Sequence, residues 1–272
     1  MPIATTAPFA MTAIEVDGHR AALADDGLRT DPAPLLLIHG AGHDHGVWRA
    51  VAGGLVAAGR RVIAPDLPGH GASAGPALAG IPSMAAWVLA LADALDLERF
   101  ALGGHSMGAL VALATAAAAP ERVSALFLLG CRAPMPVASF LLEAARTEPA
   151  QAHALINKFS FAPAERIGET RRQALEAANL ERLQAQPATV LAIDLAACDR
   201  WPDGLAAAAR VRCPALLLCA GYDRMTPAET SRPLLQALQA GADARLLELP
   251  DCGHGMLDEA PAAVIEALCA PG

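Results

Sequence analysis

Three short stretches carry side chains that could act together as a nucleophile, a base and an acid. Residues 104–108 read GHSMG and fit the pattern G-x-S-x-G around Ser106, while Asp223 follows the apolar run ALLLCAG and His254 follows ARLLELP. A serine hydroxyl attacks a carbonyl efficiently only when a base takes its proton, and an imidazole base needs an acid to orient it. The order Ser, Asp, His therefore predicts nucleophilic acyl transfer.

The serine motif is informative because of the residues around it. The run FALG (100–103), which favours a strand, leads into the motif, and the helical run ALVALAT (109–115) leads out of it. On such a sharp turn, Gly104 and Gly108 leave room for strand and helix to approach closely, and the Ser106 hydroxyl is lifted clear of the sheet. We expect a nucleophile elbow, and the alternative is an ordinary glycine-flanked turn.

The stretch HGAGHDHG (39–46) contains three histidines and an aspartate, which raises the question of a metal site. The spacing His-x₃-His-x-His has no completing Asp-His pair, and no second cluster of ligands occurs elsewhere in the sequence, so we expect no bound metal. The glycines Gly40 and Gly42 suit a loop whose backbone approaches a substrate. We expect His39 to support this loop, and His43 and His45 to be loop residues.

The elements that must position these residues are visible as hydrophobic patterns. Unbroken apolar runs are typical of strands buried on both faces of a parallel sheet, and helical patterns separate most of the runs found here. The runs cover 34–40, 60–66, 99–106, 122–130, 213–221 and 244–250. We expect an α/β fold in which Asp223 and His254 both lie at the carboxyl edge of the sheet.

Two segments depart from this alternation. Before the first run, Asp17-Gly18 is a turn signal that predicts an antiparallel hairpin. Between about residues 132 and 205, helical patterns over 140–159, 164–183 and 188–201 follow one another without a strand. The predicted domains are a core of residues 1–131 and 205–272 and a helical cap of residues 132–204. Ser83 is expected to N-cap the helix of the fragment MAAWVLALADAL.

Composition excludes several classes of function. The 272-residue chain has a formal charge of −8 and no run of Lys or Arg, which argues against nucleic acid or an anionic membrane as partner. The apolar stretch 109–120 is too short to span a bilayer and ends in proline. The first 20 residues lack the basic region of a secretory signal, and the six cysteines form no CxxC pair. A reduced, cytoplasmic protein is therefore expected.

These motifs, taken together, resemble the α/β-hydrolase superfamily, in particular its capped, esterase-like bacterial branch. The resemblance covers nearly the whole chain and weakens in the helical segment. It implies an α/β-hydrolase fold, a mostly parallel, doubly wound sheet with an inserted helical cap. The matching positions are His39-Gly40 before Trp48, DLPGHGAS (66–73), GHSMG (104–108), and Pro250 with Gly253-His254 followed by Glu259 and Pro261.

The resemblance also implies a role for individual positions. Ser106, Asp223 and His254 match the catalytic triad, and the backbone N–H groups of Ala41 and Met107 match the pair that stabilises the oxyanion. Many members place two residues between the glycine after this strand and the acid, whereas this chain has one, so Asp251 remains a second candidate for the acid.

The expected function is serine-dependent hydrolysis of a carboxylic ester with a small to medium, largely apolar substrate and without a cofactor. The same triad also serves carbon–carbon bond hydrolases, lactonases and cofactor-free perhydrolases, and these stay as alternatives. A relative that senses a ligand without turnover is a further alternative. The expected partner is a small-molecule ester, and the sequence does not indicate an oligomeric state.

Overall fold

The computed structural model describes residues 10–27 and 33–270, so the N-terminal residues 1–9 considered above lie outside the described part. Within it, eight strands form one sheet in the order β1-β2-β4-β3-β5-β6-β7-β8. The strands are β1 (Met11–Val16), β2 (His19–Asp25), β3 (Leu35–Ile38), β4 (Val62–Pro65), β5 (Phe100–His105), β6 (Val123–Leu129), β7 (Ala215–Ala220) and β8 (Ala244–Leu249).

Strand direction follows the sequence patterns. The six apolar runs form the strands β3 to β8, and all of these pair in parallel. The predicted hairpin is confirmed: β1 pairs antiparallel with β2, with Val16 opposite His19, and Asp17 and Gly18 turn the chain with φ of 51° and 77°. β2 then pairs antiparallel with β4. The predicted fold class, an α/β-hydrolase fold with a mostly parallel sheet, is confirmed.

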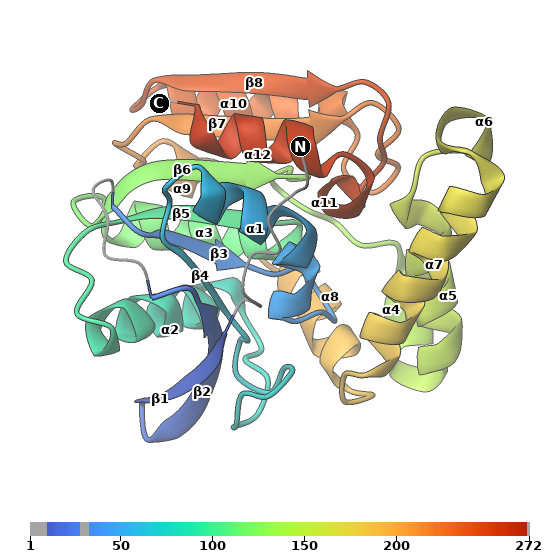
Figure 1. Cartoon of the computed structure of the whole chain (residues 1–272), viewed down its shortest axis with the longest axis horizontal. Coiled ribbons are helices and arrows are strands. Elements are labelled where there is room, and N and C mark those ends of the chain that lie inside the picture. Colours follow the sequence, from blue (N-terminus) through green and yellow to red (C-terminus); the bar gives the residue numbers. More distant parts are fainter. Residues whose placement is uncertain (1–9, 28–32, 271–272) are drawn as a thin grey trace.

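Helices cover both faces of the sheet (Figure 1). Alternate residues of β3 explain the two layers, because Leu36 and Ile38 belong to one apolar cluster and Leu35 and Leu37 to the other. The first cluster includes residues of α2 (Ile81–Ala94), α3 (Met107–Ala118), α9 (Gly204–Ala208) and α10 (Arg232–Gln239). The second includes residues of α1 (Arg49–Ala57), α11 (Met256–Glu259) and α12 (Pro261–Cys269).

The segment between β6 and β7, called here the insertion (residues 132–204), carries helices that stand to one side of the sheet (Figure 1). Some of its residues form an apolar cluster of their own, which includes Ile156, Leu183 and Leu191. Ala197 and Cys198 belong instead to the main core. The helices are α4 (Ser139–Thr147), α5 (Pro149–Ser160), α6 (Ala164–Ile167), α7 (Glu169–Gln184) and α8 (Val190–Asp199).

Three sequence expectations about helices are wrong in detail. The pattern over 140–159 forms two helices, because Pro149 keeps Glu148 out of the helical conformation (φ −139°, ψ 69°) and starts a new helix. The pattern over 164–183 divides at Gly168, which has φ +84°. Helix α2 begins at Ile81 rather than after Ser83, because Pro82 fits its first turn. The Ser83 hydroxyl instead donates to the Gly80 carbonyl.

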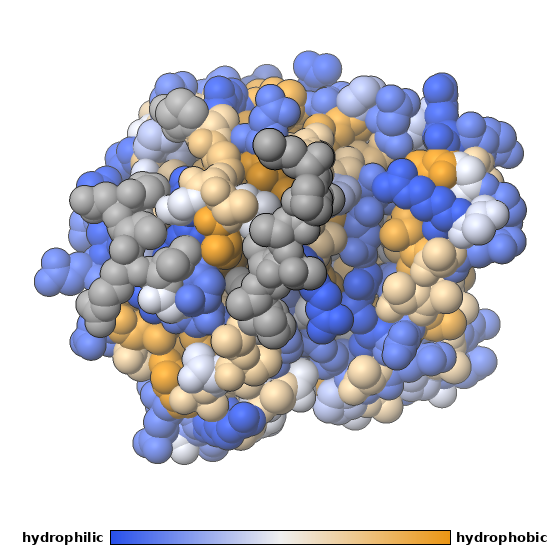
Figure 2. Space-filling view, viewed as in Figure 1, coloured by the Kyte–Doolittle hydropathy of each residue, from blue (hydrophilic) through white to orange (hydrophobic). Residues whose placement is uncertain are grey.

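The outer surface carries both hydrophilic and apolar residues. On the face of Figure 2, hydrophilic residues predominate and apolar residues form separate patches. Among the described residues, no helix is both long enough and apolar enough to cross a membrane.

Candidate active site

Ser106 lies at the tight turn between β5 and α3. Its backbone has φ 56° and ψ −119°, a left-handed conformation that a non-glycine residue adopts only under strain. The flanking glycines are required by contact, because a Cβ on Gly104 would lie 2.1 Å from the Gly108 carbonyl oxygen. A Cβ on Gly108 would lie 2.2 Å from the carbonyl oxygen of Ile38. The elbow is therefore packed directly against the end of β3.

A buried hydrogen bond joins the predicted acid and base. Asp223 follows β7, His254 follows β8, and the Nδ1–H of His254 donates to Asp223 Oδ2 over 2.7 Å. Asp223 also accepts from the Thr226 hydroxyl at 2.7 Å and from the backbone N–H groups of Met225 and Thr226 at 2.8 Å. The carboxylate is therefore held in place, and it fixes the tautomer that leaves His254 Nε2 free to accept a proton.

The electrostatics of the acid agree with this geometry. Burial alone would raise the pKa of the Asp223 carboxyl, but the charge of His254 and the hydrogen bonds from His254 and Thr226 bring that pKa well below its usual value. Asp251, the second candidate, has a side chain that is 76% exposed and lies 4.0 Å from Arg166. The structure thus places Asp223, and not Asp251, against His254.

The loop that carries His254 is held from several sides. The Nε2–H of His105 donates to the His254 carbonyl over 2.8 Å, and burial together with the charge of His254 lowers the pKa of His105 to about 3. At the end of β6, a Cβ on Gly130 would lie 3.1 Å from the His254 ring, so the glycine leaves space for the imidazole. Glu259 accepts from the Gly253 N–H at 2.8 Å.

The loop after β3 presents its backbone beside the elbow. The Gly40 carbonyl accepts from His39 Nδ1–H at 2.9 Å and from the His43 N–H at 3.3 Å. Because a trans peptide directs its N–H opposite to its C=O, these bonds orient the N–H of Ala41 away from them. Within the described residues, neither this N–H nor that of Met107 has an acceptor. Two backbone donors near Ser106, one in the loop after β3 and one in the residue that follows the serine, thus lack an acceptor in the described part of the chain.

Two cavities meet at Ser106. The smaller, of about 90 Å³, is also lined by His254 and by polar side chains that include Asn179 and Arg182. The larger, of about 340 Å³, is mostly apolar. Ala41 lines both. The insertion and the loop after Asp223 supply most of the wall of the larger cavity, through Met135, Val137, Phe140, Leu141, Leu155, Phe159 and Met225.

Comparison with known proteins agrees with this architecture. Residues 33–261 match the family model of the alpha/beta hydrolase fold. The chain belongs to the α/β-hydrolase family. The pimeloyl-[acyl-carrier protein] methyl ester esterase of Aromatoleum aromaticum is 34% identical over 81% of this chain and 90% of its own length. The structure of an enol-lactonase from Burkholderia xenovorans LB400 superposes with a TM-score of 0.82 and 25% identity, over 94% of this chain and 98% of that one.

A third relative is longer than this α/β hydrolase. The dihydrolipoyllysine-residue acetyltransferase component of an acetoin cleaving system from Pseudomonas putida is 34% identical over 87% of this chain. The chain spans 62% of that relative's length. The family model and the relatives named above support a hydrolase, and so an enzyme, without indicating which bond it cleaves.

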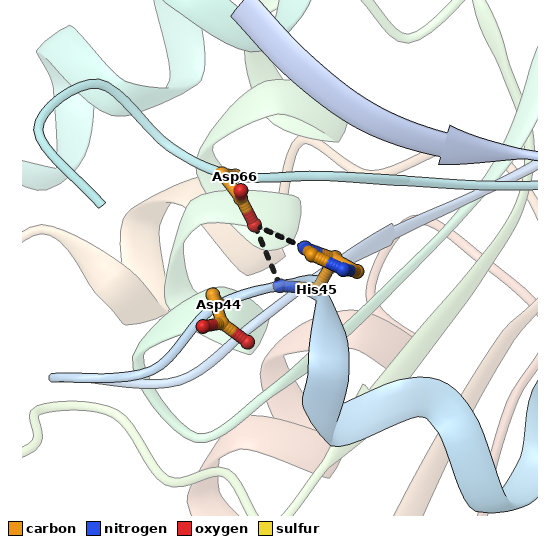
Figure 3. A group of neighbouring side chains, drawn as sticks. All are labelled: Asp44, His45 and Asp66. Carbon is orange, nitrogen blue, oxygen red and sulfur yellow. Dashed lines mark hydrogen bonds and ion pairs between the residues drawn. The ribbon is translucent and has the colours of Figure 1, made fainter. Parts of the chain in front are cut away.

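The histidines of this α/β hydrolase's loop have structural partners. His43 Nε2 lies 2.9 Å from the Asn179 side chain. Figure 3 shows the His45 ring and backbone N–H both directed at one oxygen of Asp66, at 2.7 and 2.8 Å. Asp44, His45 and Asp66 could offer ligand atoms within 4.8 Å of one another. The second Asp66 oxygen accepts from the Ala72 N–H, so this carboxylate shapes the two loops that it joins.

Sequence reasoning missed several residues of the site. Thr226 gave no signal, because its bond to Asp223 depends on the loop conformation alone. Glu259 was noted only as part of the resemblance, although it accepts both the Gly253 and the Ala162 N–H. Asp194 carried a readable signal, because it is an acidic residue within the apolar run VLAIDLAAC. Such a residue on a buried helix requires a polar partner.

Proposed function

We propose that this protein is a serine-dependent hydrolase that cleaves a carboxylic ester through an acyl-enzyme. The observation that carries the proposal is the hydrogen bond between Asp223 and His254, which lies beside a serine held on a strained elbow. A nucleophile, a base that lines the same cavity and an oriented acid are the groups that this reaction requires. Carboxylic esters are favoured among acyl substrates because one of the named relatives is a methyl ester esterase.

In the proposed reaction, His254 Nε2 takes the proton of Ser106 as its Oγ attacks the ester carbonyl. The Ala41 and Met107 N–H groups donate to the oxyanion of the tetrahedral intermediate, and Asp223 stabilises the imidazolium. His254 then protonates the leaving alcohol. In the second half, it activates the water that releases the acid. No metal or organic cofactor is required by these steps.

The insertion acts as a cap in this proposal. Because it supplies most of the apolar wall around Ser106, it selects the group that lies in the larger cavity. A volume of about 340 Å³ lies at the lower end of the range of small-molecule sites. These features support a small to medium, largely apolar acyl group. The smaller cavity, which presents Asn179 and Arg182 among apolar side chains, would then accommodate the opposite part of the substrate.

The test is a set of initial rates on p-nitrophenyl esters from acetate to dodecanoate. We expect turnover with an optimum between the two ends, because the larger cavity beside Ser106 offers a volume of only about 340 Å³. Ser106→Ala should lower kcat by at least about 10³-fold, because the remaining groups cannot form an acyl-enzyme. Equal rates for the wild type and a folded Ser106→Ala variant would contradict the proposal.

A second candidate reaction is the hydrolysis of a lactone. The similarity to an enol-lactonase supports this candidate. A lactone is an internal ester, so the same groups would open it, and the leaving alcohol would stay attached to the acid. Rates on γ- and δ-lactones, measured in the same preparation and compared with the best linear ester, distinguish the two substrates.

A further inference from the structure

A carboxylate of the insertion reaches the loop that carries the proposed oxyanion donor. Asp194 lies on α8 and has no solvent exposure. Its Oδ2 accepts from the N–H of Gly42 at 2.8 Å and from Nε2–H of His70 at 2.9 Å. Within the described residues, its Oδ1 has no hydrogen-bond partner. The buried side chain thus makes its two bonds to loops of the core and none to its own domain.

His70 is arranged to hold that carboxylate. Its Nδ1 lies 3.0 Å from the Pro68 carbonyl, and its Nε2 faces Asp194. Since both neighbours are acceptors, this arrangement favours a ring that is protonated at both nitrogens, an imidazolium. Burial alone would lower the pKa of His70, but the charge of Asp194 and the hydrogen bond to it outweigh burial and raise that pKa. Asp194 and His70 therefore form a buried ion pair between α8 and the core.

The bond from Gly42 fixes a peptide next to the proposed oxyanion donor. The carbonyl of Ala41 accepts from His43 Nδ1–H at 2.8 Å, and the N–H of the same peptide unit donates to Asp194. The peptide between Ala41 and Gly42 is planar, so hydrogen bonds to its carbonyl and to its N–H fix its orientation. The backbone directly after the Ala41 N–H is therefore held in place. Gly42 has φ +67°, and a Cβ there would lie 3.0 Å from Leu191, also on α8. The loop and α8 are therefore in direct contact.

We propose that Asp194 is a positioning residue whose carboxylate sets the oxyanion loop, so that the seating of α8 on the core completes the site. This inference rests on the proposed ester hydrolysis. Asp194 touches no reacting atom, and it acts through Gly42. With α8 displaced, the Gly42 N–H loses its acceptor and the Ala41 N–H is no longer held in a single orientation. Docking of the cap on the core and formation of the oxyanion hole are therefore coupled.

The experiment compares Asp194→Leu with Asp194→Asn on the best p-nitrophenyl ester. Leu removes the acceptor at similar volume, whereas Asn retains an acceptor oxygen for Gly42. We expect Asp194→Leu to lower kcat by about 10²-fold with KM changed by less than about threefold, since the lost interaction acts in the transition state. Asp194→Asn should restore at least about a tenth of wild-type kcat. Equal kcat in Asp194→Leu and the wild type would overturn the proposal.

Asp199→Leu is the matched control. Asp199 lies on the same helix and is exposed, and among the residues that the structure describes it accepts only from the Val137 N–H, within the insertion. Its replacement should leave kcat within about twofold of the wild type. An equal loss in both variants would mean that any disturbance of α8 reduces turnover, and it would overturn the specific role of Asp194.

A lone Leu at 194 leaves His70 buried without its partner, which can prevent folding. The double variant Asp194→Leu with His70→Leu removes both charges and restores packing. We expect it to fold with kcat still reduced by about 10²-fold, because Gly42 still lacks an acceptor. A folded double variant with wild-type kcat would overturn the proposal.

Hydrogen exchange at the Gly42 amide, measured by NMR without substrate, separates this inference from the proposed function. We expect the Gly42 amide to be protected in the wild type and to exchange at least about tenfold faster in the double variant. If the wild type lacks Ser106-dependent hydrolysis but Gly42 behaves in this way, the proposed function fails and the positioning contact stands. Unchanged exchange in the double variant would overturn the contact itself.

Discussion

At the scale of single residues, the site depends on side chains whose hydrogen bonds leave one useful group free. His254 is an example, because Asp223 occupies Nδ1 and leaves Nε2 available as a base. His39 has a comparable effect on a backbone group. Its ring donates to the Gly40 carbonyl, and this bond orients the peptide so that the Ala41 N–H has no acceptor of its own. In both cases hydrogen bonds hold a reactive group in position before the substrate binds, which is what preorganisation of an active site means.

Asp223→Asn should lower kcat of the proposed esterase by about 10³–10⁴-fold. The amide carries no charge to stabilise the imidazolium, and its NH₂ group can favour the tautomer with the proton on Nε2. The measurement is kcat on the best ester, and Asp251→Asn serves as the matched control with wild-type activity. A large loss in the Asp251 variant, with Asp223→Asn still active, would show that the acid has been assigned to the wrong residue.

Much of this residue-level picture could be predicted from sequence. Ser106 follows β5 directly, Asp223 and His254 lie in the loops after β7 and β8, and a parallel sheet brings the ends of its strands to one edge. Thr226 and Asp194 could not be placed in the same way, because their bonds depend on how loops and a helix of the insertion dock. Local patterns do not contain that information.

At the scale of elements, close backbone contacts between β3, β5 and α3 determine the elbow. Six strands could be predicted from unbroken apolar runs, although only β3 to β7 are mostly buried, and the edge strand β8 is exposed at Arg245, Leu247 and Glu248. The helices of the insertion were located in sequence but divided wrongly, because spacing alone did not reveal the breaks at Pro149 and Gly168. Proline and left-handed glycine end helices even where the apolar spacing continues.

Gly104→Ala should destabilise the fold by about 3 kcal/mol or more. The new Cβ would meet the Gly108 backbone at 2.1 Å, and backbone cannot move aside as a side chain can. Urea denaturation followed by circular dichroism measures the change. Gly80→Ala is the control, because its Cβ would have only ordinary contacts at 3.8 Å, and it should cost less than about 1 kcal/mol. Similar costs for the two variants would contradict this account of the elbow.

At the scale of the whole molecule, buried histidines whose pKa is lowered, His39 and His105 among them, make stability depend on pH. Burial, with the charge of a neighbouring histidine, lowers the pKa of His39 to about 4 and that of His105 to about 3. In the unfolded chain both rings take up protons near pH 6.5. Between pH 6.5 and 4 the unfolded state therefore binds more protons than the folded state. Stability must fall as the pH falls through this window.

Each ring should contribute about 1.4 kcal/mol per pH unit to this slope. The raised pKa values of His45 and His70 add no slope there, because both rings are protonated in both states below pH 6.5. The measurement is the free energy of unfolding in urea at pH 6.5, 5.5 and 4.5. His105→Gln should show a shallower slope than the wild type by about one proton. Parallel slopes for the two proteins would mean that His105 does not remain neutral when folded.

The position of the insertion has an evolutionary consequence. It leaves the sheet after β6 and returns to the neighbouring strand β7, so its length can change without altering any strand pairing. A different helical segment grafted between these strands would give the same reactive groups a new binding chamber. In this structure the acceptor for the Gly42 N–H comes from the insertion itself, through Asp194. If Asp194 positions the loop as proposed, a grafted segment needs an acceptor at the same place.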